Sequence, residues 1–356
     1  MPTITLRLEL HRPTLAKQAM YDQMTEMNTN FANWLLLHPE VNGATSKVFK
    51  EFSEQKFLSA VVNQTIREVK SQKKKQRAKG FKKMWCGFNN QNLKVERAGE
   101  LYTVSFPTLE KRIGVPVVAR PYQQAWIEKI ISGTVKQGAA KLYQKKRKWY
   151  IAIPITWETK QSRGEKVMGI DLGLRYLAVT SMGTKSLFFR GSAVAYTRRR
   201  YSARRRKLGK AKKLQVIYKS KNKESRWMRD QNHKISRQIV NRALANGVGV
   251  IRMEDLTDIR NRTKSRKKCE KKDQGRNLHS WAFYQLKEFI RYKAEMAGIR
   301  FEEVKAEYTS QTCKCGHREK ANRNGLRFQC KQCGYTCHAD LNGAINIGKA
   351  ISGLAA

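Results

Sequence analysis

The pattern of apolar and polar residues predicts a strand followed by a mainly helical segment. The first ten residues alternate between the two classes, as expected for a strand with one buried face. From residue 11 to about residue 77 the apolar positions instead recur at helical spacing. One such series runs from Met20 to Leu35, and a second runs from Leu58 to Val69.

Short alternating segments bounded by Gly and Pro begin near Gly87 and are typical of a small β region. Its last part predicts a hairpin in which residues 140–143 turn through residues 144–148 into a strand at 149–155. The polar run that follows, residues 157–166, is typical of a linker.

A second domain is expected to begin at Val167 with a strand that carries one carboxylate. The expected elements, in order, are strands at 167–173, 175–180 and 186–189, a long helix ending near residue 245, a strand at 248–253, an amphipathic helix at 281–297 and a short helix from residue 340. The first three strands are close in sequence and predict an antiparallel set.

The charge of the chain indicates its class of partner. Among 356 residues, 73 Lys and Arg against 28 Asp and Glu give a formal charge of +45. So large an excess repels itself, and a nucleic acid held along an extensive surface is the expected compensation. With 40% hydrophobic residues the chain can build cores, which excludes a disordered basic tail. Packing proteins of ribosomes or chromatin share such a charge, but usually in shorter chains without acidic motifs.

No apolar run reaches the length of a signal peptide core or a membrane span, so the protein is expected to stay in the cytoplasm. Two basic segments are candidates for nucleic-acid contact: Arg198–Lys213, with ten basic and no acidic residues, and Arg260–Lys272, with eight basic residues. The candidate contact residues are Arg198, Arg199, Arg200, Arg204, Arg205, Arg206, Arg260, Arg262, Lys264 and Arg266. The second segment follows Glu254 and can act as a lid.

Aromatic residues also lie among lysines near the end of the helical segment. Phe81, Trp85 and Phe88 can either stack on bases or pack into the core.

Three acidic residues are candidates for metal-dependent chemistry. Asp171 interrupts an apolar strand, where a carboxylate is costly unless it is neutralised or coordinated, and Glu254 closes a second apolar strand. Asp340 can serve as the N-cap of the last helix, but it also shares a helix face with apolar residues at offsets 3, 4, 7 and 11. Three converging carboxylates are the hard oxygen ligands that two Mg²⁺ ions need for phosphodiester hydrolysis.

Five of the seven cysteines lie between Cys313 and Cys337 and predict a zinc site. The ligand candidates are Cys313, Cys315, Cys330 and Cys333, whose two pairs are each followed by glycine. The first pair has one intervening residue, so His317, Cys337 or His338 can replace a cysteine in the ligand set. Four protein ligands leave no open position, so the expected role of zinc is structural.

Together these motifs resemble the RuvC motifs and zinc finger of the transposon-encoded TnpB nucleases, relatives of type V CRISPR effectors. The motifs, in order, are Gly-Ile-Asp171-Leu-Gly, Met-Glu254-Asp-Leu, Tyr308-Thr-Ser-Gln-Thr-Cys313, Cys330-x-x-Cys333-Gly and Asp340-Leu-Asn-Gly-Ala-Ile-Asn-Ile. The resemblance is strong from Val167 to Ile351 and only architectural before that. Two departures are the short first cysteine pair and Gly343, where the family commonly has Ala.

The resemblance implies an α+β multidomain fold: a β-barrel wedge domain with an inserted helical recognition domain, then an RNase H-like (RuvC) α/β nuclease domain with an inserted zinc finger. The implied boundaries are 1–10 and 87–156 for the wedge, 11–86 for the recognition domain, 157–166 for the linker, 167–304 and 339–356 for the nuclease domain, and 305–338 for the zinc finger.

The resemblance also implies an RNA-guided, Mg²⁺-dependent endonuclease that cuts both strands of target DNA. It implies a guide ωRNA from the transposon end, a transposon-adjacent motif, and a monomer in the RNA complex. Asp171, Glu254 and Asp340 match the family's three catalytic positions. Two alternatives stay open: a compact type V CRISPR effector, and a non-cleaving RNA-guided DNA-binding or transposition accessory protein.

Overall fold

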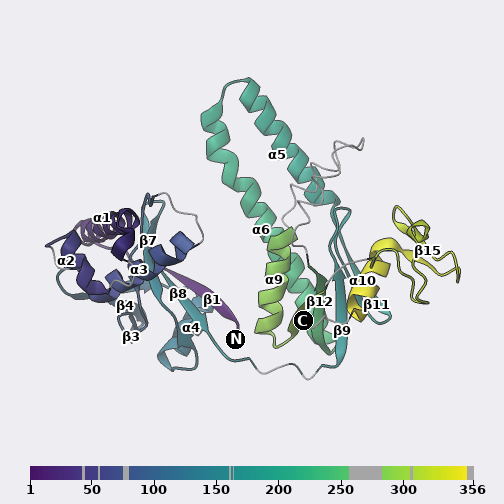
Figure 1. Ribbon diagram of the computed structural model, residues 1–356, viewed down its shortest axis with the longest axis horizontal. Coiled ribbons are helices and arrows are strands. Elements are labelled where there is room, and N and C mark those ends of the chain that lie inside the picture. The colour runs from purple at the N-terminus through teal and green to yellow at the C-terminus, as the bar shows by residue number, and fades with distance from the viewer. Residues whose placement is uncertain are drawn as a thin grey trace. The chain divides into compact units, whose positions relative to one another are not determined.

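A computed structural model describes residues 1–41, 45–54, 57–74, 80–159, 162, 164–255, 283–304 and 308–350. The chain forms two compact units, Met1–Glu158 and Thr159–Ala356 (Figure 1). None of the described helices combines the length and the apolar character that crossing a bilayer requires.

The first unit is an antiparallel sheet with helices inserted after its first strand. Its elements are β1 (Thr3–Leu10), α1 (Leu15–Leu37), η1 (Pro39–Val41), η2 (Ser46–Val48), α2 (Phe49–Phe52), α3 (Ser59–Lys74), β2 (Gly87–Phe88), β3 (Lys94–Ala98), β4 (Leu101–Pro107), β5 (Arg112–Val118), α4 (Pro121–Ile131), β6 (Lys136–Gln137), β7 (Ala140–Lys145) and β8 (Lys148–Thr156). The strand order is β2-β7-β8-β1-β5-β4-β3, and β6 pairs with β8. The predicted order of strand, helices and β region is confirmed, whereas α4 was not expected.

The core of the first unit lies between the sheet and helices α1 and α3. Tyr21 and Met24 of α1 pack with Trp149 and Phe106 of the sheet in one buried cluster. A second cluster joins α1, α2 and α3 to one another. Phe88 is fully buried, so it packs into the core and is not free to stack on bases. The end strands β2 and β3 do not pair in the described residues, so the expected barrel is open between them.

The hairpin of β7 and β8 is tighter than expected. Pairing continues through Lys145 and Lys148, so the turn consists of Lys146 and Arg147 alone. The prediction of a five-residue turn was wrong because charged residues also occupy the exposed ends of strands. Both turn residues have left-handed φ angles, 52° and 62°, which suit the twist of a two-residue hairpin.

The second unit is a mixed sheet with helices on both faces. Its elements are β9 (Lys166–Asp171), β10 (Tyr176–Met182), β11 (Lys185–Arg190), α5 (Ser192–Lys210), α6 (Leu214–Ala245), β12 (Val248–Glu254), α9 (Phe283–Met296), β13 (Arg300–Val304), η3 (Lys320–Asn322), β14 (Arg323–Asn324), β15 (Arg327–Gln329), β16 (Thr336–His338) and α10 (Ala339–Lys349). The strand order is β11-β10-β9-β12-β13. The predicted antiparallel set of three strands is confirmed, and β12 runs parallel to both of its neighbours.

Alternation along β9 sends its side chains to two different helical layers. Met168 and Ile170 are buried against α6 and α9. Gly169 and Asp171 lie on the opposite face, where α10 packs (Figure 1). Asp171 of β9 therefore faces α10, the helix that carries Asp340.

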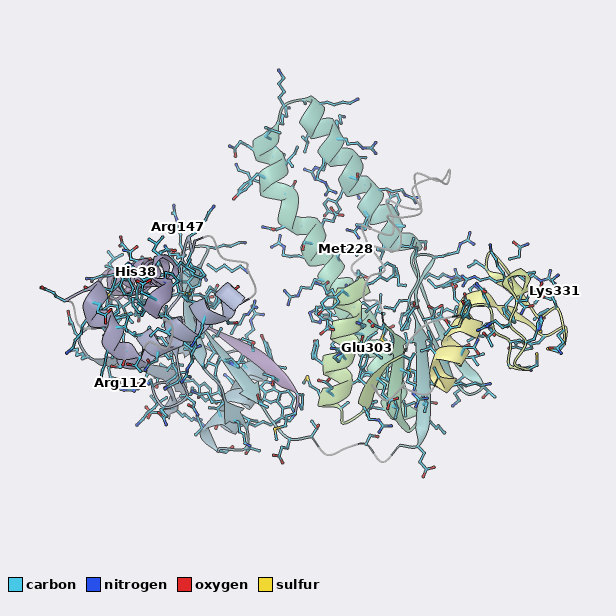
Figure 2. All side chains as sticks on the ribbon, in the orientation of Figure 1. His38, Arg112, Arg147, Met228, Glu303 and Lys331 are labelled. Atoms are coloured by element: carbon cyan, nitrogen blue, oxygen red, sulfur yellow. The ribbon has the colours of Figure 1, made fainter. Side chains whose placement is uncertain are left out.

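Helices α5 and α6 form a long hairpin that extends from the sheet (Figure 1). Its two helices are held together by Glu224 of α6, whose carboxylate forms ion pairs with Arg198 and Arg205 of α5. Met228, labelled in Figure 2, is buried where the hairpin joins the core of the unit.

Two lysines of α9 are almost fully buried. Lys287 donates to Glu303 of β13 with an Nζ to Oε2 distance of 2.7 Å, and Figure 2 labels Glu303. Lys293 donates to the backbone oxygen of His233 in α6 at 2.7 Å, and burial lowers its pKa to about 8. These contacts tie α9 to the edge strand and to α6.

We predict that Gly169→Ala destabilises the second unit. A Cβ atom at this position would collide with the backbone oxygen of Ala344 and the backbone nitrogen of Gly348 in α10. Overpacking of this kind costs about 1–3 kcal/mol. Thermal unfolding of the purified chain measures the loss.

Gly209→Ala in α5 is the matched control, because a Cβ atom there meets nothing within 4 Å. This helical substitution should be neutral or stabilise by up to about 1 kcal/mol. Equal unfolding temperatures for the two variants would contradict the close packing of α10 on β9.

Candidate active site and metal centre

Two of the three predicted acids lie at the ends of neighbouring parallel strands. Met253 of β12 pairs with Ile170 of β9. Glu254 and Asp171 each follow by one residue, so they sit side by side and point to the same face of the sheet. That face is the one on which α10 packs.

The third acid approaches from α10. His338 is the N-cap of this helix, and its Nδ1 accepts a hydrogen bond from the backbone N–H of Asp340 at 3.2 Å. Asp340 is therefore inside the first turn, and the alternative that it is the N-cap is wrong. Gly343, Ala344 and Ile347 on the same helix face are buried, as the pattern predicts.

The absence of a side chain at Gly343 gives the site its space. A Cβ atom there would lie 2.9 Å from Oδ2 of Asp171. The two elements thus approach closely enough that one methyl group would press on the carboxylate.

The carboxylates interact unfavourably with one another. Burial, followed by the charges of Asp340 and Glu254, raises the pKa of Asp171 to about 8, while the Arg323 charge lowers it. Burial and like charges both disfavour the ionised form of a carboxyl group. A cation bound between the acids would remove this cost, so the electrostatics fit a metal site.

Arg323 is a functional candidate that the sequence patterns did not reveal. It begins β14 in the cysteine-rich segment, and its Nη2 donates to Oδ1 of Asp340 at 3.1 Å. Only about a third of its side chain is exposed. No motif marked it, because it reaches the acids only when the cysteine-rich segment folds against α10.

In the described residues, four cysteines are the one group of potential metal ligands whose ligand atoms all lie within 4.8 Å of one another. The three acids supply hard carboxylate oxygens, which are the ligands that Mg²⁺ prefers and that two-metal phosphodiester hydrolysis uses.

The four cysteines fit zinc in both identity and spacing. The Sγ atoms of Cys313 and Cys333 are 3.6 Å apart, and those of Cys315 and Cys330 are 3.7 Å apart. Tetrahedral coordination with Zn–S bonds of about 2.3 Å places sulfur atoms about 3.8 Å apart. The one-residue spacing of the first pair therefore does not prevent a tetrahedral arrangement.

The three alternative zinc ligands lie outside the group of four cysteines. His317 contacts Glu319 at 3.2 Å. His338 caps α10, and its ring packs against the rings of Tyr176 and Phe188. Cys337 lies outside the group of four cysteines. The structure thus brings together the four cysteines of the original prediction.

The cysteine knuckle, residues 308–338, is bound to α10 by two asparagines. Asn342 donates to the backbone oxygen of Thr312 at 2.9 Å. Asn346, one helical turn later, donates to the backbone oxygens of Thr309 and Thr312, each at 2.7 Å. Lys331, labelled in Figure 2, marks the second cysteine pair of the knuckle.

The predicted nucleic-acid contacts are only partly free. Arg198 and Arg205 bind Glu224 within the α5–α6 hairpin. The other predicted arginines of α5 are exposed, namely Arg199, Arg200, Arg204 and Arg206. The remaining predicted contacts lie outside the described residues, namely Arg260, Arg262, Lys264 and Arg266.

Two family models match the chain. The model described as "Probable transposase" matches residues 143–260, which include Asp171 and Glu254. The model described as "Cas12f1-like, TNB domain" matches residues 283–347, which include the cysteines and Asp340.

Similar proteins extend the match. A "CRISPR-associated endodeoxyribonuclease Cas12f1" of Sulfoacidibacillus thermotolerans is 32% identical over 67% of this chain, which spans only 59% of that relative. A Cas12f1 solved as a complex with sgRNA and target DNA shares the fold, with a TM-score of 0.70 at 16% identity over 94% of this chain and 82% of that one. The "TnpB-like protein MJ0751" of Methanocaldococcus jannaschii is 30% identical over 67% of this chain and 87% of its own length. The identity and coverage of this last relative show that the chain belongs to the TnpB family.

Proposed function

We propose that the protein is an RNA-guided endonuclease that cuts both strands of a DNA target. The observation that carries the proposal is the convergence of Asp171, Glu254 and Asp340 on one face of the mixed sheet. The surrounding topology, with β9 flanked by an antiparallel and a parallel neighbour, supports an RNase H-like, RuvC-type domain. The names of the Cas12f1 relatives are consistent with this activity.

The three acids hold the catalytic ions in this proposal. When bound, two Mg²⁺ ions supply an activated water and neutralise the charge that develops on the phosphodiester. The chain itself fixes the acids on two strands and one helix, so their positions are set before the target arrives. Asp171 faces α10 from the central strand. It lies beside Glu254 of β12 and faces the helix that carries Asp340.

Arg323 has two successive tasks in this proposal. In the absence of a metal ion its guanidinium neutralises Asp340. If a metal ion bound Asp340, the Arg323 guanidinium would be available to hold a nonbridging phosphate oxygen, a contact for which arginine is well suited.

The first unit is the proposed wedge domain with an inserted helical recognition domain, with the boundaries that the resemblance implies. The guide is an ωRNA of the transposon end, target sequence is read by pairing with the guide, and the protein reads a short adjacent motif. The exposed arginines of α5 contact nucleic-acid phosphates, and the complex contains one copy of the chain. The location is the cytoplasm of a prokaryote.

A compact type V CRISPR effector is the second candidate. It is favoured by the match of residues 283–347 to the Cas12f1-like TNB model. The chemistry would be the same, so the source of the co-purifying guide RNA separates the two candidates.

We predict that Asp171→Ala reduces cleavage at least about a thousandfold and leaves target binding intact. The substitution removes a metal ligand, whereas binding depends on guide pairing and basic contacts. Cleavage and binding are measured side by side with the guide complex in Mg²⁺. Near-normal cutting by the variant disproves the site, and specific cutting by RNA-free wild-type protein disproves guide dependence.

We predict that Arg323→Gln slows cleavage about tenfold to a hundredfold without loss of zinc. The loss reflects one charge-assisted contact to the reacting phosphate. Single-turnover cleavage rates provide the measurement, and Arg327→Gln on the neighbouring strand β15 is the control because its side chain is exposed. Equal rates for the two variants would show that Arg323 only balances Asp340.

We predict that zinc is bound by the four cysteines and is structural. Cys330→Ser should lower the metal content from about one zinc ion per chain and destabilise the second unit, because metal binding contributes directly to folding. Elemental analysis and thermal unfolding measure the two effects. His317→Ala and Cys337→Ser are controls that should retain zinc, and a loss of zinc in either would place that residue in the site.

A further inference from the structure

A pocket in the first unit lies far along the chain from the carboxylates and has its own chemistry. It has a volume of about 450 Å³ and opens where β1 ends, β5 ends and β8 begins. Its lining residues include Glu9, His11, Arg12, Val118, Arg147 and Lys148. This volume falls within the range of small-ligand sites.

The charges of the pocket favour an anion. Its one acid, Glu9, is neutralised by Lys148, with an Nζ to Oε1 distance of 2.6 Å, and also accepts a hydrogen bond from Tyr150. Arg12 and Arg147 form no hydrogen bond or ion pair through their side chains with another residue that the structure describes. Arg12 and Arg147 thus line the same pocket, and its one carboxylate is already paired with Lys148 and Tyr150.

The backbone is strained at both arginines. Five non-glycine residues of the described chain have positive φ angles, and three of them adjoin this pocket: Arg12 at 38°, Lys146 at 52° and Arg147 at 62°. Such conformations cost free energy for residues with a Cβ atom and cluster at functional sites. A two-residue hairpin of this type favours Asn-Gly. The Lys-Arg pair is therefore less stable than Asn-Gly in this turn, and it places a cation beside the pocket.

Two further features suit a nucleotide. Helix α1 starts beside the pocket with no acidic residue in its first turn, so its N-terminal end adds positive potential. A second hollow of about 270 Å³ shares His11 and Val118 with the first and is also lined by Leu101, which is 57% exposed. A base can lie against this apolar wall while its phosphate meets the arginines.

We propose that this pocket binds one nucleotide through its phosphate group, with Arg12 and Arg147 as the phosphate ligands. Figure 2 labels Arg147 in the first unit. The site contains no metal ligand of the nuclease centre, and binding is measured without Mg²⁺. Its failure and that of the nuclease proposal are therefore distinguishable.

The test uses the full chain freed of co-purified nucleic acid and the variant Lys146→Asn with Arg147→Gly. This pair relieves the backbone strain and removes two cations. The melting temperature should rise by about 2–4 °C. The affinity for a 5′-phosphorylated ten-nucleotide RNA should fall about tenfold, and the salt dependence of binding should weaken by about one phosphate contact.

Lys94→Gln with Lys136→Gln is the matched control, because both lysines are exposed on strands of the same unit and neither lines the pocket. It removes the same charge and should weaken binding much less. If the two double variants lose affinity equally, the pocket is not a phosphate site and the strain belongs to the short hairpin alone.

Arg12→Gly is a second, independent variant, since it also relieves strain and removes one ligand. It should lose affinity if the proposal holds, and unchanged affinity overturns it even if the hairpin variant does not fold.

Matched probes then identify the source of the phosphate. Equal losses with RNA and DNA of the same sequence indicate a backbone phosphate, and a loss confined to the 5′-phosphorylated strand indicates a terminal one. Competition by AMP in the wild-type chain, absent from the variants, indicates a free nucleotide. The proposal is wrong if, with every one of these probes, the pocket variants lose no more affinity than the control variant.

Discussion

The close approach of helix α10 to strand β9 is the constraint on which the second unit depends. Backbone meets backbone at Gly169 and Gly348, and the missing side chain of Gly343 leaves room for the Asp171 carboxylate. At Gly169 only glycine permits this contact, because a Cβ atom there would collide with the backbone of α10. The same approach forces Asp340 toward Asp171 and raises the pKa of that residue. The close packing of α10 on β9 thus concentrates negative charge at this site, and a bound cation would neutralise it.

This acidic site lies in a chain whose formal charge is +45, so the rest of the surface has the opposite character. Some of the few acidic residues form ion pairs with basic residues of the same unit. Glu224 joins α5 to α6 through two arginines, and Glu9 neutralises Lys148 at the edge of the pocket in the first unit. Because such pairs consume only a small part of the excess, the free protein retains strong self-repulsion. A bound polyanion would remove it.

Sequence patterns predicted the elements with simple periodicity and missed those that depend on tertiary partners. The apolar strand around Asp171 and the long helix α6 follow directly from spacing. Strand β13 was missed because its charged residues, including Glu302, are acceptable only where Arg252 on the neighbouring strand pairs with them, with an Nε to Oε2 distance of 2.7 Å. Arg323 was missed for a related reason, since its contact with Asp340 joins residues that no local pattern connects. The acids and cysteines were visible because metal chemistry restricts residue type and spacing.

The knuckle and the helix that bears Asp340 form one packing unit, although the predicted boundary between the zinc finger and the nuclease domain lies between residues 338 and 339. Strand β16 runs directly into α10, and Ala339 packs in the same small core as Cys313 and Cys330. Asn342 and Asn346 then bind the other side of the knuckle to the helix. Because α10 cannot shift without breaking these contacts, order at the four cysteines extends to the Asp340 carboxylate. A zinc ion bound by these cysteines would therefore help to fix the geometry of the proposed catalytic centre.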